Sequence, residues 1–348
     1  MSEMQTDFKK IIGEMLESSP QDIEAVGEFE PTPIDQIVEK QDMEEDDSKE
    51  IFSVTIKDRQ SLKERMVDVS VDSTKRLVIA IDSSSVTLAK TKNGIIAAIK
   101  AAVVFDDHVE TFGPFIHHIT NNNKQKIYNY FINEIFDLPV TKNVAVLSKM
   151  PDRIRNFLER LIQRYAASKV ENAIILWDGS LGTGKSQFDT PEDLMKISLT
   201  MAKGRGSSIV AITKKTTLIL ASNESIFSVL SDYDGPAIVD LTDKIEVFGS
   251  RIYKILGTTF AAKLTSNGIP FRIDVSSDGK SKPSSVLVDL MRSTSFYHGY
   301  PVELRNAHIY SKITKDEALA CQKMIATTYN LPIVNAPDIH KVLLSPFG

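Results

Sequence analysis

The sequence has 348 residues, a length typical of about two domains or of one large domain with an appendage. Hydrophobic residues make up 42% of it, enough to bury a full core, while the single cysteine, Cys321, excludes an intrachain disulfide and favours a reducing compartment. No apolar run approaches the roughly 20 residues of a membrane span, and the first residues lack an apolar signal region, so we expect a cytoplasmic protein that does not interact with membranes.

The net charge of −5 is distributed unevenly along the chain. Residues 1–50 contain 16 acidic and 4 basic residues, a net charge of −12, whereas residues 51–348 contain 30 acidic and 37 basic residues, a net charge of +7. This asymmetry is typical of a body that binds nucleic acid and carries an acidic arm. An acidic solvated tail beside an ordinary surface explains the same charges, and the sequence leaves both interpretations open.

The first seventy residues predict an appendage to the main body. Apolar residues at helical spacing between Phe8 and Leu16 predict an amphipathic helix, whose apolar stripe must dock on the body or on a partner. Residues 28–50 are rich in Pro, Glu and Asp and predict a linker with little capacity to form a core. A short helix is expected around residues 58–68. We therefore predict an N-terminal part over residues 1–70 and a main domain over residues 71–348.

The main domain is predicted to alternate between strands and helices. A buried strand over residues 77–81 is predicted to end at Asp82, and the turn at 92–94 predicts antiparallel strands that reach to about Ile116. The further predicted elements are helices near 122–137 and 151–168, a strand ending at Asp178, a helix from Pro191 to about Lys203, a strand carrying Lys214 and Lys215, a short strand over 237–240, a hairpin over 251–264 and 269–276, and a helical end of the chain.

Asp82 and Asp178 each follow a buried strand and precede small residues. A strand interior rejects an unpaired carboxylate, whereas the carboxyl ends of strands in open α/β sheets are where ligands bind. Two carboxylates brought together there repel each other unless a cation lies between them, and oxygen ligands of this kind suit Mg²⁺ or Mn²⁺. The pair therefore predicts a divalent-metal site, although each aspartate taken singly is explained as well by a turn or helix cap.

The loop after Asp178 also matches a phosphate-binding pattern. Residues 179–186, Gly-Ser-Leu-Gly-Thr-Gly-Lys-Ser, fit the P-loop motif, in which a helix must begin at the second glycine. Here Thr190, followed by Pro191 and two acidic residues, predicts that the helix begins at Pro191 instead. We favour the metal site. The alternative is a nucleotide-binding protein that uses Lys185 and Ser186, with Asp240 on the metal.

A second cluster of polar residues lies near the end of the main domain. His298, Tyr300, Arg305 and His308 fall within eleven positions, although the chain has only 6 histidines. Arg305 and His308 lie three residues apart on a predicted helix and therefore share one face. A guanidinium can bind a phosphate through two hydrogen bonds, and an imidazole can bind a metal or transfer a proton.

Four segments together resemble the NurA family of DNA-repair nucleases. IAIDSSS, FLE ahead of IILWDGSL, AITK and HGYPVELRNAH occur in the family's order and at similar spacing, over roughly residues 76–313. The resemblance implies an α/β protein with an RNase H-like mixed sheet flanked by helices. It also implies a homodimer that uses Mn²⁺ or Mg²⁺ to degrade DNA during end resection in double-strand break repair, together with a hexameric HerA-type translocase.

The resemblance also implies roles for six residues. Asp82, Glu159, Asp178 and His308 would bind the metal, and Tyr300 and Lys214 would orient or neutralise the phosphate. This chain has Asp-Ser-Ser at residues 82–84 where relatives often show Asp-Gly-Ser, and the GTGKS extension after Asp178 is unusual.

The helical and strand patterns add two expectations about these residues. Glu159 lies away from the centre of the apolar helix face, so we expect it to be solvated. Lys214 and Lys215 are expected on opposite faces of one strand.

A third interpretation of the whole chain is a non-catalytic protein that docks on a translocase through its N-terminal helix.

Overall fold

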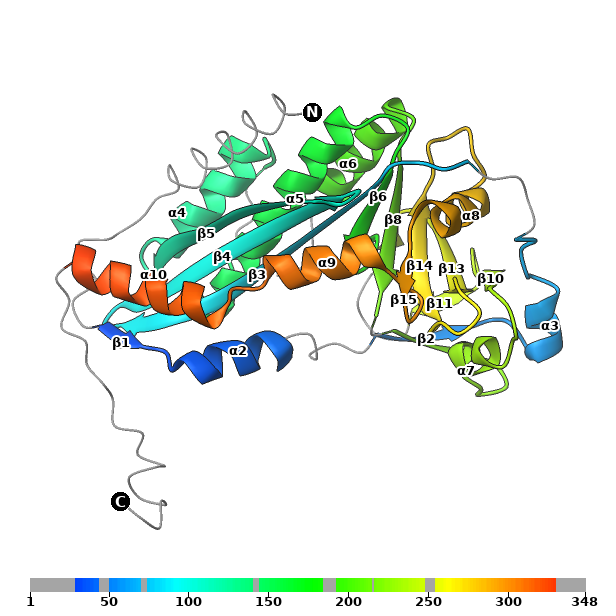
Figure 1. Cartoon of the computed structure of the whole chain (residues 1–348), viewed down its shortest axis with the longest axis horizontal. Coiled ribbons are helices and arrows are strands. Elements are labelled where there is room, and N and C mark those ends of the chain that lie inside the picture. Colours follow the sequence, from blue (N-terminus) through cyan, green and yellow to red (C-terminus); the bar gives the residue numbers. More distant parts are fainter. Residues whose placement is uncertain are drawn as a thin grey trace, which may run out of the picture.

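A long mixed β-sheet forms the centre of the protein (Figure 1). The computed structural model describes residues 29–43, 50–69, 74–139, 144–183, 192–214, 216–247 and 254–329. Within these residues the sheet has nine strands. They are β1 (Phe29–Pro31), β3 (Val78–Thr91), β4 (Gly94–Phe105), β5 (His108–Thr120), β6 (Ile174–Asp178), β8 (Ser208–Thr213), β10 (Ala237–Asp240), β13 (Thr258–Lys263) and β14 (Phe271–Ser276).

The strand order confirms the predicted RNase H-like arrangement. β3, β4 and β5 form an antiparallel meander, after which β6 pairs in parallel with the free edge of β3 and β8 pairs in parallel with β6. Parallel neighbours need a crossover, and helices α5 (Met150–Lys169) and α6 (Glu192–Gly204) provide these two crossovers. Beyond β8 the sheet continues with the antiparallel strands β14, β13 and β10, of which β13 and β14 form the predicted late hairpin.

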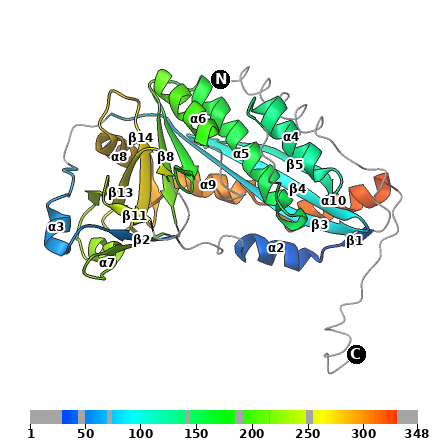
Figure 2. The ribbon, with the colours of Figure 1, turned by 180° about the vertical axis from the view of Figure 1, so that it is seen from behind.

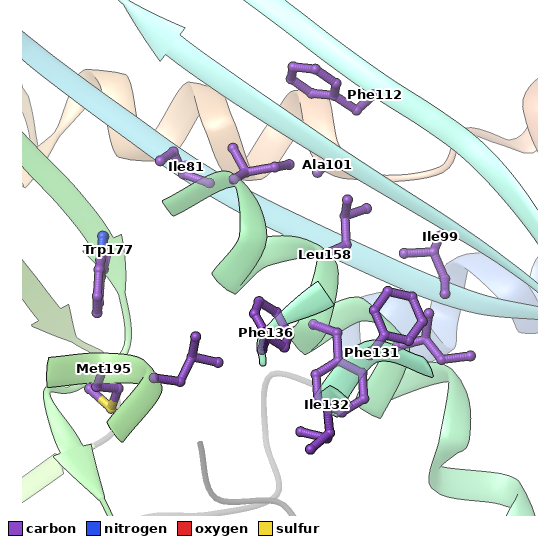
Figure 3. Packing of buried hydrophobic residues seen from close by; sticks show 14 of the residues in the cluster. Ile81, Ile99, Ala101, Phe112, Phe131, Ile132, Phe136, Leu158, Trp177 and Met195 are labelled. Carbon is purple, nitrogen blue, oxygen red and sulfur yellow. The ribbon is translucent and has the colours of Figure 1, made fainter. Parts of the chain in front are cut away.

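Helices cover both faces of this sheet, as Figures 1 and 2 show. One face carries α4 (Lys124–Asn129), the π-helix that continues it (Tyr130–Ile135), α5 and α6, and the opposite face carries α8 (Pro283–Ser293) and α9 (Val302–Ser311). Alternate residues of β3 face the two sides, so that Ile79 and Ile81 pack under α5 whereas Val78 and Ala80 pack on the other side. Figure 3 shows the α5 side, where Leu158, Phe131 and Trp177 lie in one apolar cluster.

Smaller elements surround the main sheet. One small sheet consists of β2 (Glu50–Val54), β9 (Thr216–Leu220) and β11 (Ile245–Val247). Two strand pairs are formed by β7 (Gly182–Thr183) with β12 (Lys254–Ile255) and by β15 (Phe296–Tyr297) with β16 (Tyr300–Pro301). The further helical elements are α2 (Ile34–Met43), α3 (Arg59–Lys63), a 3-10 turn (Leu147–Lys149), α7 (Ile226–Ser231) and α10 (Lys315–Thr328). None of the helices in the described ranges combines the length and apolar character needed to cross a bilayer.

The structure corrects the expectation that residues 28–50 form a linker. β1 pairs with the end of β3, and α2 packs on the same layer, where Phe29 and Ile37 are buried together with Ile325 of α10. The partly buried Ile34 packs on the same cluster, and Gln41 exchanges two hydrogen bonds with the backbone of Ile313, so the segment is anchored even though its composition is acidic. The predicted helix over residues 8–16 lies outside the described residues, and the boundary at residue 70 stays a prediction.

Two strands also differ from their predicted lengths. β3 does not end at Asp82 but continues to Thr91, because its pairing with β4 runs through the serines without interruption. The predicted strand over Lys214 and Lys215 is in fact two strands, β8 and β9, in different sheets. β8 ends at Thr213, and Lys214 lies in the connection between them.

A buried histidine in β5 leads to a first prediction, which concerns stability. His117 is 1% exposed, neither of its ring nitrogens has a hydrogen-bond partner among the described residues, and burial lowers its pKa to about 4. Folding therefore opposes protonation, so the stability present above the unfolded pKa of 6.5 is lost as the pH falls towards 4. Between pH 7 and pH 5 this single group should cost about 2 kcal/mol of unfolding free energy.

Urea unfolding of the His117→Phe variant at both pH values checks this prediction. The variant should lose about 2 kcal/mol less than the parent between pH 7 and pH 5, because the carboxylates titrate in both proteins and only the buried imidazole differs. The exposed His108 provides the control, and His108→Phe should keep the parent's pH dependence. An unchanged pH dependence in His117→Phe would contradict the assignment.

Candidate metal centre

Asp82 and Asp178 meet at the point where β6 ends. Pairing between β3 and β6 runs as far as Ile81 opposite Trp177, so the two aspartates follow directly on adjacent parallel strands. β3 continues past this point, whereas β6 turns away at Gly179, which has a φ of 106° that favours glycine. The Gly179 carbonyl accepts a hydrogen bond from Thr213 Oγ1 at 2.8 Å, which ties this turn to the end of β8.

Helix α9 contributes a third donor group to the two aspartates. The Nδ1 atom of His308 lies 2.8 Å from Oδ2 of Asp82, and the hydroxyl of Ser311 lies 3.5 Å from the same oxygen. One ligand atom each from Asp82, Asp178 and His308 lie within 4.8 Å of one another. Two carboxylates and an imidazole match the donors that Mn²⁺ and Mg²⁺ accept, so the residues present fit a divalent cation.

Lys214 partly neutralises the charge of this cluster. Its Nζ atom lies 2.8 Å from Oδ2 of Asp178 and 5.6 Å from the centre of the Tyr300 ring. Burial raises the pKa of the Asp178 carboxyl; Lys214 opposes that shift, the nearby Asp82 adds to it, and His308 also lowers the pKa. The lysine reaches the site from the connection after β8, not from a strand position as its spacing had suggested.

Glu159 is buried, which corrects the expectation that it is solvated. Its side chain accepts hydrogen bonds from Ser83 Oγ at 2.6 Å and from Gln163 Nε2 at 3.0 Å. Burial raises the pKa of its carboxyl and Asp82 raises it further, while Arg160 and Arg155 lower it. Glu159 is therefore electrostatically coupled to the site, but it is not in the group of donor atoms formed by Asp82, Asp178 and His308.

The packing of α5 on β3 explains the burial of Glu159. Residues seven apart on a helix share one face, and here Asp152 binds Ser85 at 3.0 Å while Glu159 binds Ser83. Neighbouring residues on a strand point to opposite faces, so Ser83 faces α5 while Asp82 faces α9. Glu159 thus approaches the centre from the other side of β3.

Three residues that support the site were not singled out from the sequence. Ser83 and Gln163 each donate a hydrogen bond to Glu159, and Ser311 donates one to Asp82. Their spacing held a signal, because Gln163 lies four residues after Glu159 and Ser311 lies three residues after His308. Each therefore shares a helix face with a predicted site residue.

The remaining predicted residues are placed as follows. Tyr300 lies on β16, with its ring 5.6 Å from that of Phe271 and 5.6 Å from the Nζ atom of Lys214, which pairs with Asp178. Of the P-loop motif, Gly182 and Thr183 form β7, and α6 begins at Glu192. Residues 184–191 lie outside the described residues, so nucleotide binding by Lys185 and Ser186 stays a prediction.

Comparison with known proteins yields matches only among solved structures. No protein-family model matches the chain, and no curated protein matches its sequence. The NurA nuclease from Sulfolobus solfataricus is 16% identical with a TM-score of 0.49, over 79% of this chain and 90% of that chain. A structure of NurA bound to dAMP and manganese is 9% identical with a TM-score of 0.43, over 80% of this chain and 91% of that one.

Endonuclease V structures are also similar to this chain. The catalytic domain of human Endonuclease V is 13% identical with a TM-score of 0.35, over 79% of this chain and 95% of that chain. At these values the likeness concerns the course of the chain and says nothing of the chemistry. The NurA nucleases that the sequence motifs resemble are thus among the solved proteins to which this chain is similar.

Proposed function

We propose that this protein is a divalent-metal-dependent nuclease that hydrolyses the phosphodiester bonds of DNA. The observation that carries the proposal is the convergence of Asp82, Asp178 and His308, whose donor atoms lie within 4.8 Å of one another although the residues come from three distant parts of the chain. Two adjacent carboxylates repel each other, and Lys214 neutralises only part of their charge, so the cluster favours a bound cation. Its surroundings supply Lys214, a cation suited to a phosphate.

Each residue has a part in this chemistry. Asp82 and Asp178 would hold Mn²⁺ or Mg²⁺, and the bound cation would neutralise charge on the phosphate oxygens. His308, oriented through Nδ1 by Asp82, would act as a further ligand or as a proton carrier. Lys214 and Tyr300 would hold the phosphate. Glu159 is proposed as the third acidic residue, coupled to the centre through Ser83.

The biological setting is proposed from the resemblance of the sequence motifs. DNA ends would be the substrate, and resection during double-strand break repair the process. A homodimer working in the cytoplasm with a HerA-type hexameric ATPase would be the active assembly. Light scattering of the purified chain, alone and mixed with such an ATPase, would test both associations, and a monomer that ignores the ATPase would contradict them.

Metal removal provides the direct test of the proposed centre. We expect the purified chain to degrade labelled linear DNA with Mn²⁺ or Mg²⁺ and to lose this activity in EDTA. We also expect the cation to stabilise the folded state by about 2.7 kcal/mol at a concentration 100 times its dissociation constant. Thermal unfolding of EDTA-treated protein, with and without added MnCl₂, measures the shift.

Two strand-end aspartates provide a matched pair of variants for this measurement. Asp178→Asn should abolish the stabilisation by Mn²⁺, whereas Asp240→Asn, at the end of β10, should leave it intact. Asp240 caps its own turn by accepting a hydrogen bond from the Thr242 amide, which an asparagine can still accept. If the stabilisation instead depends on Asp240 and on added ATP, the nucleotide-binding alternative is favoured. If DNA stays intact with both Mn²⁺ and Mg²⁺, a non-catalytic protein is favoured.

A further inference from the structure

The hairpin formed by β15 and β16 is fixed in one position beside the metal centre. Its turn residues His298 and Gly299 both have positive φ, at 51° and 87°, as a two-residue turn between antiparallel strands requires. The His298 carbonyl accepts a hydrogen bond from the Ile269 amide at 2.9 Å. A Cβ atom on Gly299 would lie 2.9 Å from the Gly268 backbone, so the hairpin can pack this closely only with glycine.

This rigid hairpin presents an exposed aromatic ring under a guanidinium. Tyr297 is 53% exposed, and the Arg305 guanidinium carbon lies 4.5 Å from the centre of its ring. Over the part of the chain that the structure describes, this guanidinium contacts the Tyr297 ring and binds neither a carboxylate nor a carbonyl. Other arginines such as Arg59 and Arg76 bind carboxylates. Because a guanidinium stacks through its face, its N–H groups stay available in the plane.

The pair of Tyr297 and Arg305 is next to the metal centre through two elements, the helix α9 and the hairpin of β15 and β16. Arg305 lies three residues before His308 on α9, so the two side chains share a helix face. Tyr297 lies directly opposite Tyr300, and side chains opposite each other on paired strands share one face. Tyr300 in turn contacts Lys214, the cation paired with Asp178. Tyr297 and Arg305 are therefore neighbours of residues at the metal centre, the first through Tyr300 and Lys214 and the second through His308.

We propose that Tyr297 and Arg305 form a nucleotide subsite beside the scissile phosphate, in which the aromatic surface stacks an unpaired base and the guanidinium binds the adjoining phosphate. This inference rests on the proposed nuclease function and specifies its substrate, a DNA strand whose nucleotides at the site are not base-paired. Base–aromatic stacking needs an open base face, which a paired base inside a duplex does not offer. The phosphate contact adds affinity without regard to sequence.

Binding to abasic DNA separates the two contacts. The Asp178→Asn protein, in which cleavage is suppressed, is titrated with a short fluorescein-labelled single strand, with the same strand carrying abasic residues, and with a blunt duplex. Introducing Tyr297→Ala should weaken binding of the intact strand about tenfold and leave the abasic strand unaffected. Introducing Arg305→Ala should weaken binding of both single strands. It should also lower the slope of the logarithm of the binding constant against the logarithm of the salt concentration by about one, the value for one phosphate contact.

Two surface residues away from the subsite serve as matched controls. Tyr310 is 47% exposed on another side of α9, and Arg205 pairs with Glu171 before β6, at the opposite end of that strand from Asp178. Alanine at either position should leave binding of all three probes unchanged. All variants should unfold at the parent's temperature, since Tyr297, Tyr310 and Arg205 are exposed and, among the described residues, Arg305 binds the Tyr297 ring alone.

The outcomes distinguish the two proposals. If the parent protein cleaves DNA with Mn²⁺ but Tyr297→Ala binds intact and abasic strands as the parent does, the subsite is overturned and the nuclease function stands. If the parent cleaves no DNA with either cation, the nuclease function itself fails. A duplex bound as tightly as the single strand, with both variants weakening it equally, also overturns the assignment of an unpaired base.

Discussion

Replacing Asp82 or Asp178 with asparagine is expected to lower the rate of DNA cleavage by roughly 10³-fold or more, equivalent to losing about 4 kcal/mol of transition-state stabilisation. Each substitution removes one of the two negative charges that face each other at the end of β6 and that make the site attractive to a divalent cation. Asparagine keeps the shape of the side chain, so the loss reports charge and not packing. Initial rates on end-labelled linear DNA with saturating Mn²⁺ measure the effect.

Stability of the same variants shows whether the loss is catalytic. Burial raises the pKa of Asp178, which means that its ionised form is held in the metal-free fold at a cost. Asp178→Asn removes this cost, so the metal-free variant should unfold at the same temperature as the parent or a higher one. Asp240→Asn should retain full activity. An Asp178→Asn protein that still degrades DNA at the parent's rate would refute the proposed centre.

Removing the carboxylate of Asp274 is expected to destabilise the protein by about 3–5 kcal/mol, because it leaves the guanidinium of Arg272 buried without its anion. Both side chains are fully buried, and Arg272 Nη2 lies 2.9 Å from Asp274 Oδ2. Asp274 also accepts hydrogen bonds from Thr259 Oγ1 at 2.8 Å and from the Leu181 amide at 3.0 Å. Urea unfolding of Asp274→Ala measures the loss.

A double variant tests the cause of this destabilisation. In Arg272→Met combined with Asp274→Leu no buried charge is left unpaired, so most of the lost stability should return. The exposed pair of Lys315 and Asp35 is the control, and Asp35→Ala should cause no measurable change because solvent screens that contact. A double variant as unstable as Asp274→Ala would show that the hydrogen bonds to Thr259 and Leu181 outweigh the ion pair.

The Leu181 contact also links this ion pair to the metal centre. Leu181 follows Asp178 by three residues, and its amide is bound to a carboxylate on β14. The turn that aims Asp178 at Asp82 is thus held from two sides, by Asp274 and by Thr213 of β8. Asp274→Ala should therefore weaken Mn²⁺ binding in the fraction of protein that stays folded. The double variant should regain most of its stability but less of its Mn²⁺ affinity, because it still lacks the carboxylate that binds the Leu181 amide.

Much of the fold was predictable from local patterns. The apolar run before Asp178, the Thr-Pro-Glu-Asp start of α6 and the turn after Lys92 each identify an element from adjacent residues, and the structure confirms β6, α6 and the β3–β4 hairpin. The proximity of Asp82 and Asp178 was also predictable, since parallel neighbouring strands present corresponding residues at one place. The polar cluster ending at His308 pointed to α9 as the third contributor.

Burial and register were not predictable in the same way. Glu159 appeared solvated because its own helix shows a single apolar face, but α5 is covered on several sides, and Ser83 of β3 supplies a polar partner from 76 positions away. The serines after Asp82 predict the end of a strand, but β4 pairs with β3 through all three of them and on to Thr91. The segment around Phe29 appeared to be a linker, although β3 and α10 were available to cover it.

The sequence by itself determined which residues carry the charges and donors, and which elements hold most of them, because helix and strand periodicity depends on neighbours a few positions away. Only the tertiary structure decided how those groups are buried and paired. It placed His308 Nδ1 2.8 Å from Asp82, buried Glu159 on the other face of β3, and moved Lys214 from an expected strand to a connection. The physical reason is that burial and electrostatic interaction depend on contacts between residues far apart in the chain, whereas the periodicity of a helix or strand reports only on neighbours a few positions away.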